Sequence, residues 1–534
     1  MSSVEFSRRG FLKSAVAGAT AGAAGFTAAA KTPGLDECAT RGSEWQRPPK
    51  QTGNGLNLIV IVADTFRADN LACYGPKWLE HLETPNLGRF AQRATVFADA
   101  YAEVMPTIPI RRTLYTGRRG IPAYYFPQHE GVQLPGWHPL YHEDVTLSET
   151  LLEAGYINTL ISSLYHQFKP GRNFHRGFHT WEWIRGLEFD FYGTAPHHPL
   201  DVSDLVSDEY LAKNPGLRGS LSQYKANRNR WQQQGESVSQ ITAQAGIQWL
   251  NQNSSELPFY LQVEFFDPHE PWDPPRRFLE KYMPDAHGPS FIEPPYDTVP
   301  LSDDIKNRMR ANYAGAVSCV DYWIGSLLAT IEQLGLLEHS VVVFMGDHGA
   351  MVGERGQFLK GPDKLRGQVT HVPLLVHVPG NPHAGKKVQG FVQFPDVMPT
   401  VLGQLGLKVP SRVTGKDFWP LLTGGSTHEF VVQAYGWVAA VRNEEWSYSE
   451  IWKPEAHESK FHKYPDAPAA PYQPQLYNLQ DDPKELTDVA DKYPDVARQM
   501  AARMKEYIAS GEGVTLGSFN GKPSLDVQEG LYSK

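Results

Sequence analysis

Three short runs of apolar, mostly β-branched residues recur along the chain and indicate its fold. They cover residues 57–63, 340–345 and 372–376. Continuous apolar runs of this length are typical of strands that are buried on both faces of a parallel sheet. Segments with helical spacing lie between them, for example residues 321–336. The alternation predicts an α/β sandwich, with a large, mostly parallel mixed sheet between helices.

A chain of 534 residues exceeds what one hydrophobic core usually supports, so we expect a large and a small domain. Residues 31–54 are rich in Pro, Gly and polar side chains and are predicted to be a linker. The pattern changes near residue 425 to shorter strand-like pieces and a final helix around residues 494–508. We therefore predict a large α/β domain over residues 55–425 and a small α+β domain over residues 426–534.

The first thirty residues have the pattern of an export signal. Arg8-Arg9 and Phe11-Leu12 precede a weakly apolar Ala/Gly run that ends at Ala30. This order resembles a twin-arginine signal over residues 1–30, which predicts a periplasmic or extracellular protein, whether or not the signal is cleaved. The alternative is a basic amphipathic helix or a membrane anchor, but the run is shorter than the ~20 residues of a spanning helix. No later stretch is expected to span a membrane.

Charge and cysteine content exclude several classes of protein. Charged residues make up 20% of the chain and the net charge is -9, without a cluster of Lys and Arg, so a nucleic-acid partner is not expected. Three cysteines, Cys38, Cys73 and Cys319, cannot all pair within one chain. They predict at most one disulfide, and their spacing fits no zinc motif.

Acidic and imidazole side chains follow two of the predicted strands directly. Asp64 follows the first strand, and Asp347 and His348 follow the second. An aspartate in such a place is often only a turn former or a helix cap. Because ligands bind beyond the carboxyl ends of parallel strands, two such sites together instead predict a metal-binding site made of these three residues.

The loop at residues 105–118 offers a nucleophile for that metal site. A catalyst for phosphate or sulfate esters needs a cation to neutralise charge and a nucleophile held beside it. A hydroxyl on this loop could complete the metal sphere and be activated by the metal. Thr107, Thr113 and Thr116 carry such hydroxyls.

These segments resemble the sulfatase family of the alkaline phosphatase superfamily over nearly all of the mature chain. Thr107-Ile108-Pro109-Ile110-Arg111, followed by Leu114-Tyr115-Thr116-Gly117-Arg118, is similar to the family's nucleophile signature. Further segments fall in the family's order: residues 64–75, 266–271, 346–349, 360–361, 373–376, 476–479 and 482–485. The resemblance implies an alkaline-phosphatase/sulfatase-like fold, one divalent metal ion and hydrolysis of sulfate or phosphate esters of small molecules or glycans.

The resemblance also gives each candidate a role, with Thr107 as nucleophile and as a fourth metal ligand. Arg111 and Lys360 would contact the oxygens of the transferred group, and His269 would protonate the leaving alcohol. His166 matches the histidine of a helping segment. Each has a plainer alternative: a surface ion pair for Arg111, a solvated loop charge for Lys360, a turn for His269 and loop packing for His166. An imidazole ligand favours Mn²⁺ or Zn²⁺ over Ca²⁺, which remains possible.

Three positions depart from the family's pattern. The family's Cys or Ser, which is oxidised to formylglycine, is Thr107 here; Thr65 replaces the second carboxylate of an Asp-Asp pair, and Leu164 replaces a Lys. The departures favour phosphate mono- or diesters as substrates. The alternatives are an arylsulfatase-like sulfuric ester hydrolase, a catalytically dead binding protein and a transferase that passes a phospho-group to an alcohol.

Overall fold

The computed structural model describes residues 53–511, except for residues 122–135, 170, 189, 194–199, 215, 256–257, 297–299, 437 and 453–471. The predicted export signal and all but two residues of the predicted linker lie outside the described residues.

The main sheet has eight strands and is mixed, as predicted. In spatial order they are β11 (Lys387–Gln393), β2 (Thr95–Tyr101), β10 (Leu374–His377), β7 (Ser340–Gly346), β1 (Asn57–Ala63), β6 (Phe259–Phe265), β4 (Ile157–Ser162) and β5 (Thr180–Trp183). Only β10 runs antiparallel to its neighbours, β2 and β7. The predicted strand 57–63 is β1, 340–345 lies within β7, and 372–376 overlaps β10.

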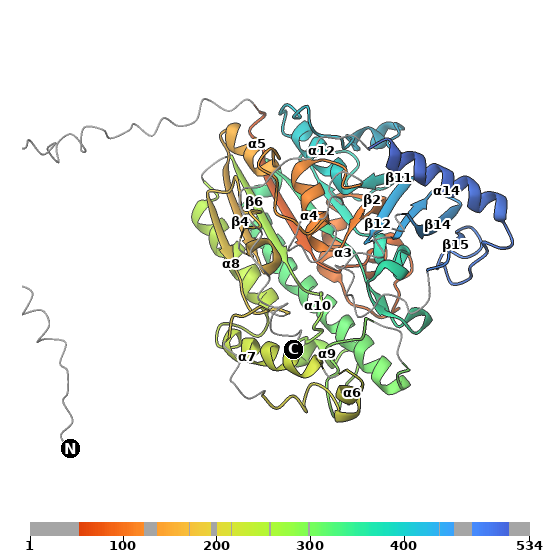
Figure 1. Cartoon of the computed structure of the whole chain (residues 1–534). Coiled ribbons are helices and arrows are strands. Elements are labelled where there is room, and N and C mark those ends of the chain that lie inside the picture. Colours follow the sequence, from red (N-terminus) through yellow and green to blue (C-terminus); the bar gives the residue numbers. More distant parts are fainter. Residues whose placement is uncertain are drawn as a thin grey trace, which may run out of the picture. The chain divides into compact units, whose positions relative to one another are not determined.

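Alternate side chains of the central strand enter two separate cores. Ile59 and Ile61 of β1 pack in one core with residues of α3 (Pro85–Ala91), α8 (Val238–Asn253) and α10 (Asp303–Gln333). Leu58 and Val60 point to the other face, with α4 (Thr107–Thr116), α5 (Leu147–Glu153) and α12 (Val397–Gln404). The sheet therefore lies between two layers of helices, which confirms the predicted sandwich (Figure 1).

Helix α10 differs from its prediction in length and in character. It begins at Asp303, not near Asp321, and the hydroxyl of Ser302 caps it by accepting from the amide of Ile305. An 18-residue window of this helix has a mean hydropathy of 1.3, so by length and composition alone it could cross a membrane. By length and composition alone it therefore departs from the expectation that no later stretch is long and apolar enough to span. Since 72% of that window is buried inside the fold, α10 is a core helix here.

A second sheet of five strands joins the C-terminal region to the segment before α4. Its order is β15 (Gln475–Asn478), β14 (Trp446–Ile451), β13 (Val438–Arg442), β12 (Val431–Tyr435) and β3 (Val104–Met105). Helix α14 (Pro494–Ala509), predicted around residues 494–508, packs against β13 and β14 (Figure 1). β3 pairs in parallel with β12, with Val104 opposite Ala434. Two residues that lie just before Thr107 thus belong to the C-terminal sheet.

The buried carboxyl of Glu103 ties this junction to α14. It accepts hydrogen bonds from the amide of Gly120 at 3.0 Å and from the hydroxyl of Tyr507 at 3.3 Å. Burial raises the pKa of Glu103 to about 7, although Gly120 and Arg119 oppose the shift. The guanidinium of Arg119 lies 3.5 Å from the centre of the Tyr507 ring. The start of α4 and the C-terminal helix are therefore held by one polar cluster.

Two of the three cysteines lie in the described part of the chain, and both are free thiols. Burial raises the pKa of Cys73 to about 11 and that of Cys319 well above its usual value. Neither is therefore an ionised nucleophile near neutral pH. Cys38 lies outside the described residues.

Candidate active site

The predicted metal ligands come together where β1 and β7 end. The strands are parallel neighbours with Ala63 opposite Gly346, so the next residues, Asp64 and Asp347, emerge side by side. With His348 they form a cluster in which one ligand atom from each lies within 4.8 Å of the others. All three side chains are fully buried. The structure thus brings together the three residues that the sequence singled out.

The imidazole of His348 has a nitrogen available for a metal. Its Nδ1 lies 3.0 Å from the carbonyl of Gly349, so Nδ1 carries the proton and Nε2 holds a lone pair. Nε2 is buried without a hydrogen-bond partner in the described part of the chain, 3.8 Å from oxygens of Asp64 and Asp347. Burial lowers the pKa of His348 to about 4, so the ring is neutral at pH 7. A neutral imidazole is the form that binds metals.

The two carboxylates face each other and favour a cation between them. Burial raises the pKa of Asp64 well above its usual range, and the charge of Asp347 raises it further. Burial also opposes ionisation of Asp347, but His348 and Arg111 hold the pKa of that carboxyl below its usual range. Two acids and an unused imidazole nitrogen are a donor set that fits one divalent cation.

Arg111 lies among these carboxylates on helix α4. Its Nη1 donates to Asp347 Oδ2 at 2.5 Å, its Nη2 to Asp64 Oδ2 at 3.4 Å and its Nε to Glu264 Oε2 at 3.0 Å. Thr107, the first residue of α4, is four positions earlier and so projects from the same face of the helix. The helix N-terminus adds a positive potential at Thr107. The predicted nucleophile therefore belongs to the same helix face as the arginine that contacts the metal ligands.

Thr65, which departs from the family's pattern, supports the metal ligands on both sides. Its amide donates to Asp347 Oδ1 at 2.8 Å and its hydroxyl to Asp64 Oδ1 at 2.9 Å. Its φ is 59°, in the left-handed region that a β-branched residue rarely adopts. Leu359, next to Lys360, has a φ of 58°. Such strain is typical of functional sites, where the surrounding structure holds the backbone in place.

Lys360 and His269 lie in direct contact, with Glu270 as their common partner. Lys360 Nζ lies 2.8 Å from His269 Nε2, and 2.8 and 2.9 Å from the two oxygens of Glu270. Burial lowers the pKa of His269 to about 4, so its Nε2 accepts from the ammonium group. Burial opposes ionisation of Glu270, but His269 and Lys360 lower its pKa to about 2. All three ammonium protons of Lys360 thus have acceptors within the protein.

His166 lies beside this group across an aromatic ring. Its Nε2 is 3.0 Å from Glu188 Oε2. The ring of Phe266 stacks on His269 with centroids 4.2 Å apart and meets His166 edge-on at 6.1 Å. The structure therefore places both predicted histidines at one side of the site, with Phe266 between them.

The structure also brings three glutamates into the site that were not among the predicted site residues. Glu264 binds Arg111, and it also accepts from the hydroxyl of Tyr115 at 2.9 Å. The sequence contained a signal for Glu264, because it is the only charged residue in strand β6, whose residues are all buried. Glu270 lay inside a quoted motif. Glu188 had no signal in the sequence, since it lies on a loop after β5.

Comparison with known proteins places the chain in a family. The model of the sulfatase family matches residues 56–407, which include every residue of the site described above. The chain belongs to the sulfatase family. A second model, for the C-terminal part of N-sulphoglucosamine sulphohydrolase, matches residues 353–510. This sulfatase-family chain is therefore a metal-dependent hydrolase that acts on sulfate or phosphate ester bonds.

The relatives of this family member include both sulfatases and phosphatase-type enzymes. Human iduronate 2-sulfatase is 25% identical over 442 residues, covering 71% of this chain and 74% of the relative. A multifunctional alkaline phosphatase superfamily protein, PehA of Trinickia caryophylli, is 22% identical over 88% of this chain and 98% of its own. The crystal structure of a phosphonate monoester hydrolase of Agrobacterium radiobacter matches with a TM-score of 0.61 and 20% identity, over 85% and 96% of the two chains. That likeness supports the fold.

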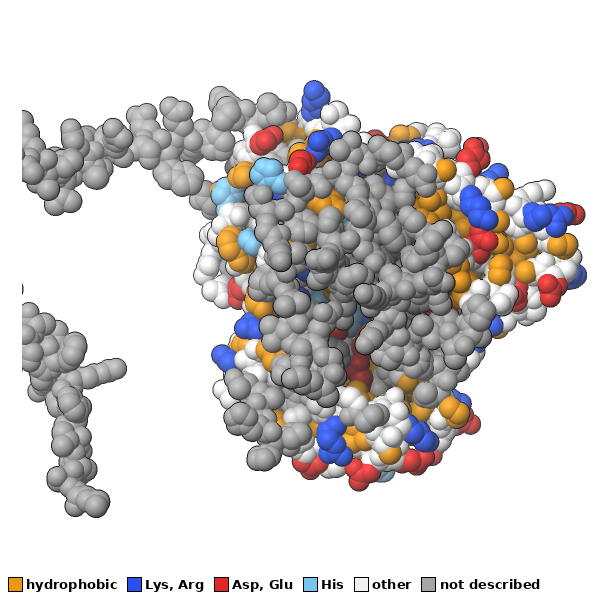
Figure 2. Space-filling view, viewed as in Figure 1, with side chains coloured by type: hydrophobic (Ala, Val, Ile, Leu, Met, Phe, Trp, Pro, Cys, Tyr) orange, Lys and Arg blue, Asp and Glu red, His pale blue; other side chains and the backbone are white. Residues whose placement is uncertain are grey.

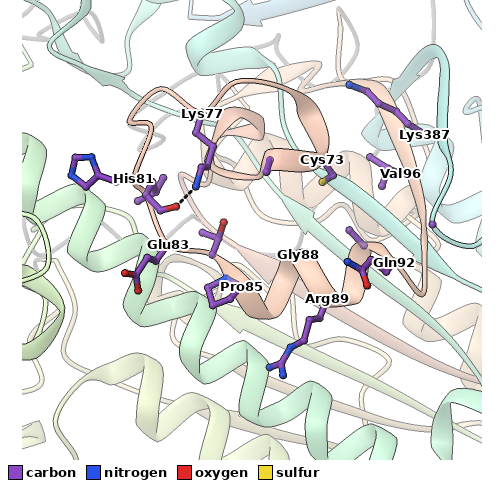
Figure 3. Close-up of a pocket in the computed structure, with 15 residues that line it drawn as sticks. Cys73, Lys77, His81, Glu83, Pro85, Gly88, Arg89, Gln92, Val96 and Lys387 are labelled. Atoms are coloured by element: carbon purple, nitrogen blue, oxygen red, sulfur yellow. Dashed lines mark hydrogen bonds between the residues drawn. The ribbon is translucent and has the colours of Figure 1, made fainter.

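A separate cavity lies at the other end of the strands. It has a volume of about 910 Å³ and includes Val96 and Lys387, at the starts of β2 and β11. Because β2 runs parallel to β1 and β7, this end is opposite to Asp64 and Asp347. Figure 3 shows Lys77 and Lys387 on different sides of the cavity, with Cys73 on its wall. None of the predicted site residues lines it.

Proposed function

We propose that this enzyme hydrolyses phosphate mono- or diesters faster than the matching sulfate esters, with Thr107 as its nucleophile. The observation that carries the proposal is the position of Thr107, at the N-terminus of α4 and one turn before Arg111, which contacts Asp64 and Asp347. Small molecules or glycans would supply the ester. Export through Arg8-Arg9, to the periplasm or beyond, belongs to the same proposal.

Asp64, Asp347, His348 and the Thr107 hydroxyl would hold one divalent ion, for which Mn²⁺ or Zn²⁺ suits the imidazole better than Ca²⁺. When bound, this ion supplies positive charge that neutralises the ester oxygens and favours ionisation of a nearby hydroxyl. Arg111 and the N-terminus of α4 add further positive charge on the side of the nucleophile.

The remaining residues would move the proton. The Thr107 hydroxyl gives its proton to water, its Oγ forms a bond to phosphorus, and the bond from phosphorus to the leaving oxygen breaks. Lys360 donates to His269 Nε2, so a proton passed from the ammonium group to the imidazole can continue to the leaving alcohol. Glu270, held ionised between them, stabilises the charge during this transfer. Water then attacks phosphorus and the bond from phosphorus to Thr107 Oγ breaks. One proton of this water returns to Oγ, and solvent returns the proton that Lys360 gave up.

The choice of phosphate over sulfate follows from what threonine lacks. The hydrate of formylglycine carries two hydroxyls on one carbon, so the second can expel sulfate by breaking a C–O bond. A threonine sulfate has no second hydroxyl, and water would have to attack sulfur directly. Phospho-threonine has no such difficulty, because cationic groups stabilise in-line attack on phosphorus.

The test compares p-nitrophenyl phosphate, a phosphodiester, a phosphonate monoester and p-nitrophenyl sulfate. The phosphorus esters should show the higher kcat/KM. Thr107→Ala should lose at least ~10³-fold of the activity, as expected when a covalent nucleophile is removed. Thr113→Ala is the matched control, because its hydroxyl bonds only within α4, to the carbonyl of Ile110. Faster turnover of the sulfate ester, or a nearly active Thr107→Ala variant, would contradict the proposal.

A further inference from the structure

Three glutamates surround the Lys360–His269 pair outside the metal cluster. Glu270 binds Lys360, and Glu188 binds His166. Glu293 is the third, and its charge interacts with those of Glu270 and Glu188. We name Glu188, Glu270 and Glu293 the acidic subsite.

Glu293 is the member of the subsite that lacks a partner. Only 9% of the residue is exposed, and its Oε2 has no hydrogen-bond partner within the described part of the chain. Burial raises the pKa of its carboxyl well above the usual range, and Glu270 and Glu188 raise it further. Lys360 is the cation that counteracts this shift. A buried acceptor without a donor is costly, so its presence indicates a ligand that supplies one.

The cations around the subsite do not balance its carboxylates. Lys360 is already engaged by both oxygens of Glu270. Lys169 acts on Glu188 but lies over the ring of Tyr165, with Nζ 4.9 Å from its centre. His269 is neutral at pH 7 because burial lowers its pKa to about 4. Among the described residues, the cation that acts on Glu293 is therefore Lys360, which Glu270 already engages.

Aromatic rings lie next to these carboxylates. The hydroxyl of Tyr296 donates to Glu270 Oε1, and its ring centre lies 5.9 Å from Lys360 Nζ. Phe266 stacks on His269. Carboxylates beside aromatic faces are the surroundings that organic ammonium groups prefer. Figure 2 shows acidic (red) surface near the centre of the face that it presents.

We propose that the acidic subsite binds an ammonium group on the alcohol part of the substrate, which makes the enzyme selective for esters of amino alcohols or amino sugars. This inference rests on the proposed ester hydrolysis at the same site. The place of the ammonium group follows from His269, the proposed proton donor to the leaving oxygen, because its Nδ1 lies 3.4 Å from Oε2 of Glu270 in the subsite. A second metal ion is the less favoured occupant, because among the described residues only Asp64, Asp347 and His348 have metal-ligand spacing.

The kinetic test uses 2-aminoethyl phosphate and n-propyl phosphate, which differ by an ammonium in place of a methyl group. The two alcohols differ as leaving groups, so the quantity compared between variants is the ratio of their kcat/KM values. Glu293→Gln keeps the size of the side chain and removes the carboxylate that would pair with the ammonium group. It should lower the ratio about tenfold, the value of one charge-assisted hydrogen bond. Glu450→Gln, a partly buried acid on β14, is the matched control and should keep the wild-type ratio.

A binding test without turnover separates this inference from the proposed function. The probes are 3-aminopropylphosphonate and n-butylphosphonate, which replace the ester oxygen by CH₂, and calorimetry gives their affinities. The amino compound should bind the wild-type protein at least tenfold more tightly, and Glu293→Gln should remove this preference. If the preference is present without any ester turnover, the subsite stands and the proposed function fails. Equal affinities, or loss of a second bound metal ion in Glu293→Gln, would overturn the subsite.

Discussion

Replacing Asp64 by Asn should have opposite effects on the metal-free and the metal-loaded protein. In the metal-free protein, Asp64 and Asp347 are two buried acids that share a hydrogen bond, which requires a proton on one of them. The amide of an asparagine can donate the same hydrogen bond without a proton, and its oxygen can still accept from Thr65. The substitution should therefore stabilise the metal-free protein.

The sizes of the two effects on the free energy of unfolding follow from the same contacts. Relief of the buried charge should raise the free energy of unfolding of the metal-free Asp64→Asn variant by about 1–3 kcal/mol at pH 8. A metal ion present at 100 times its Kd adds about 2.7 kcal/mol to the wild type, and should add almost nothing to a variant that has lost a ligand. The order of stability should therefore reverse between chelator and metal.

Urea unfolding with chelator and with Mn²⁺ or Zn²⁺, together with metal analysis of the purified proteins, measures both effects. Asp321→Asn is the matched control: this buried acid on α10 accepts from the amides of Asn86 and Leu87, so its effect should be the same under both conditions. The reasoning is refuted if wild type is the more stable protein in chelator, or if Asp64→Asn keeps full metal occupancy.

Three further predictions concern Arg111, Glu103 and the N-terminus. Arg111→Ala should destabilise the metal-free protein by about 3–5 kcal/mol, because it leaves buried carboxylates without their cation. Urea unfolding measures this loss, and Arg111→Lys should lose less of the free energy of unfolding. Since the pKa of Glu103 is raised to about 7, the folded state retains a proton that the unfolded chain has lost, so wild-type stability should fall from about pH 4.5 to 7. Glu103→Gln should remove up to about 3 kcal/mol of that fall in unfolding curves at pH 5 and pH 8, and an unchanged slope would refute it. Replacing Arg8 and Arg9 by Lys should trap the precursor in the cytoplasm, as fractionation would show.

The hydrophobic pattern was sufficient to predict the bounds of the central strands but not those of the long helix. Residues 57–63 are apolar throughout, so their burial on both faces could be predicted, and β1 has these bounds. The first half of α10 contains polar residues that tertiary contacts bury, such as Asn312, whose side-chain Nδ2 donates to the carbonyl of Ser290 at 2.6 Å. The pattern there does not show one apolar face. The helix ends before Leu336 because Gly335, with a φ of 68°, provides the left-handed residue after it.

The metal cluster could be predicted because its residues are adjacent in sequence to the ends of neighbouring strands. Asp64 and Asp347 need only the register of β1 and β7 to meet. Glu188 and Glu293 lie on loops that are distant in sequence from each other and from Lys360. Their meeting depends on the packing of the whole domain, which local pattern does not encode. The same is true of the contact between Lys360 and His269, although both residues were predicted from their motifs.

The pairing of β3 with β12 has a consequence for how this chain can evolve. The strand that leads into Thr107 has its sheet neighbour more than 300 residues later, and the amide of Ala434 donates to the carbonyl of Glu103 at 2.7 Å. A gene that lost the codons from Val431 onward would leave Val104 and Met105 as an unprotected edge directly before α4. Recombination that exchanged the C-terminal region alone would have to bring a strand that fits this edge. The two parts of the chain are therefore expected to have been inherited together.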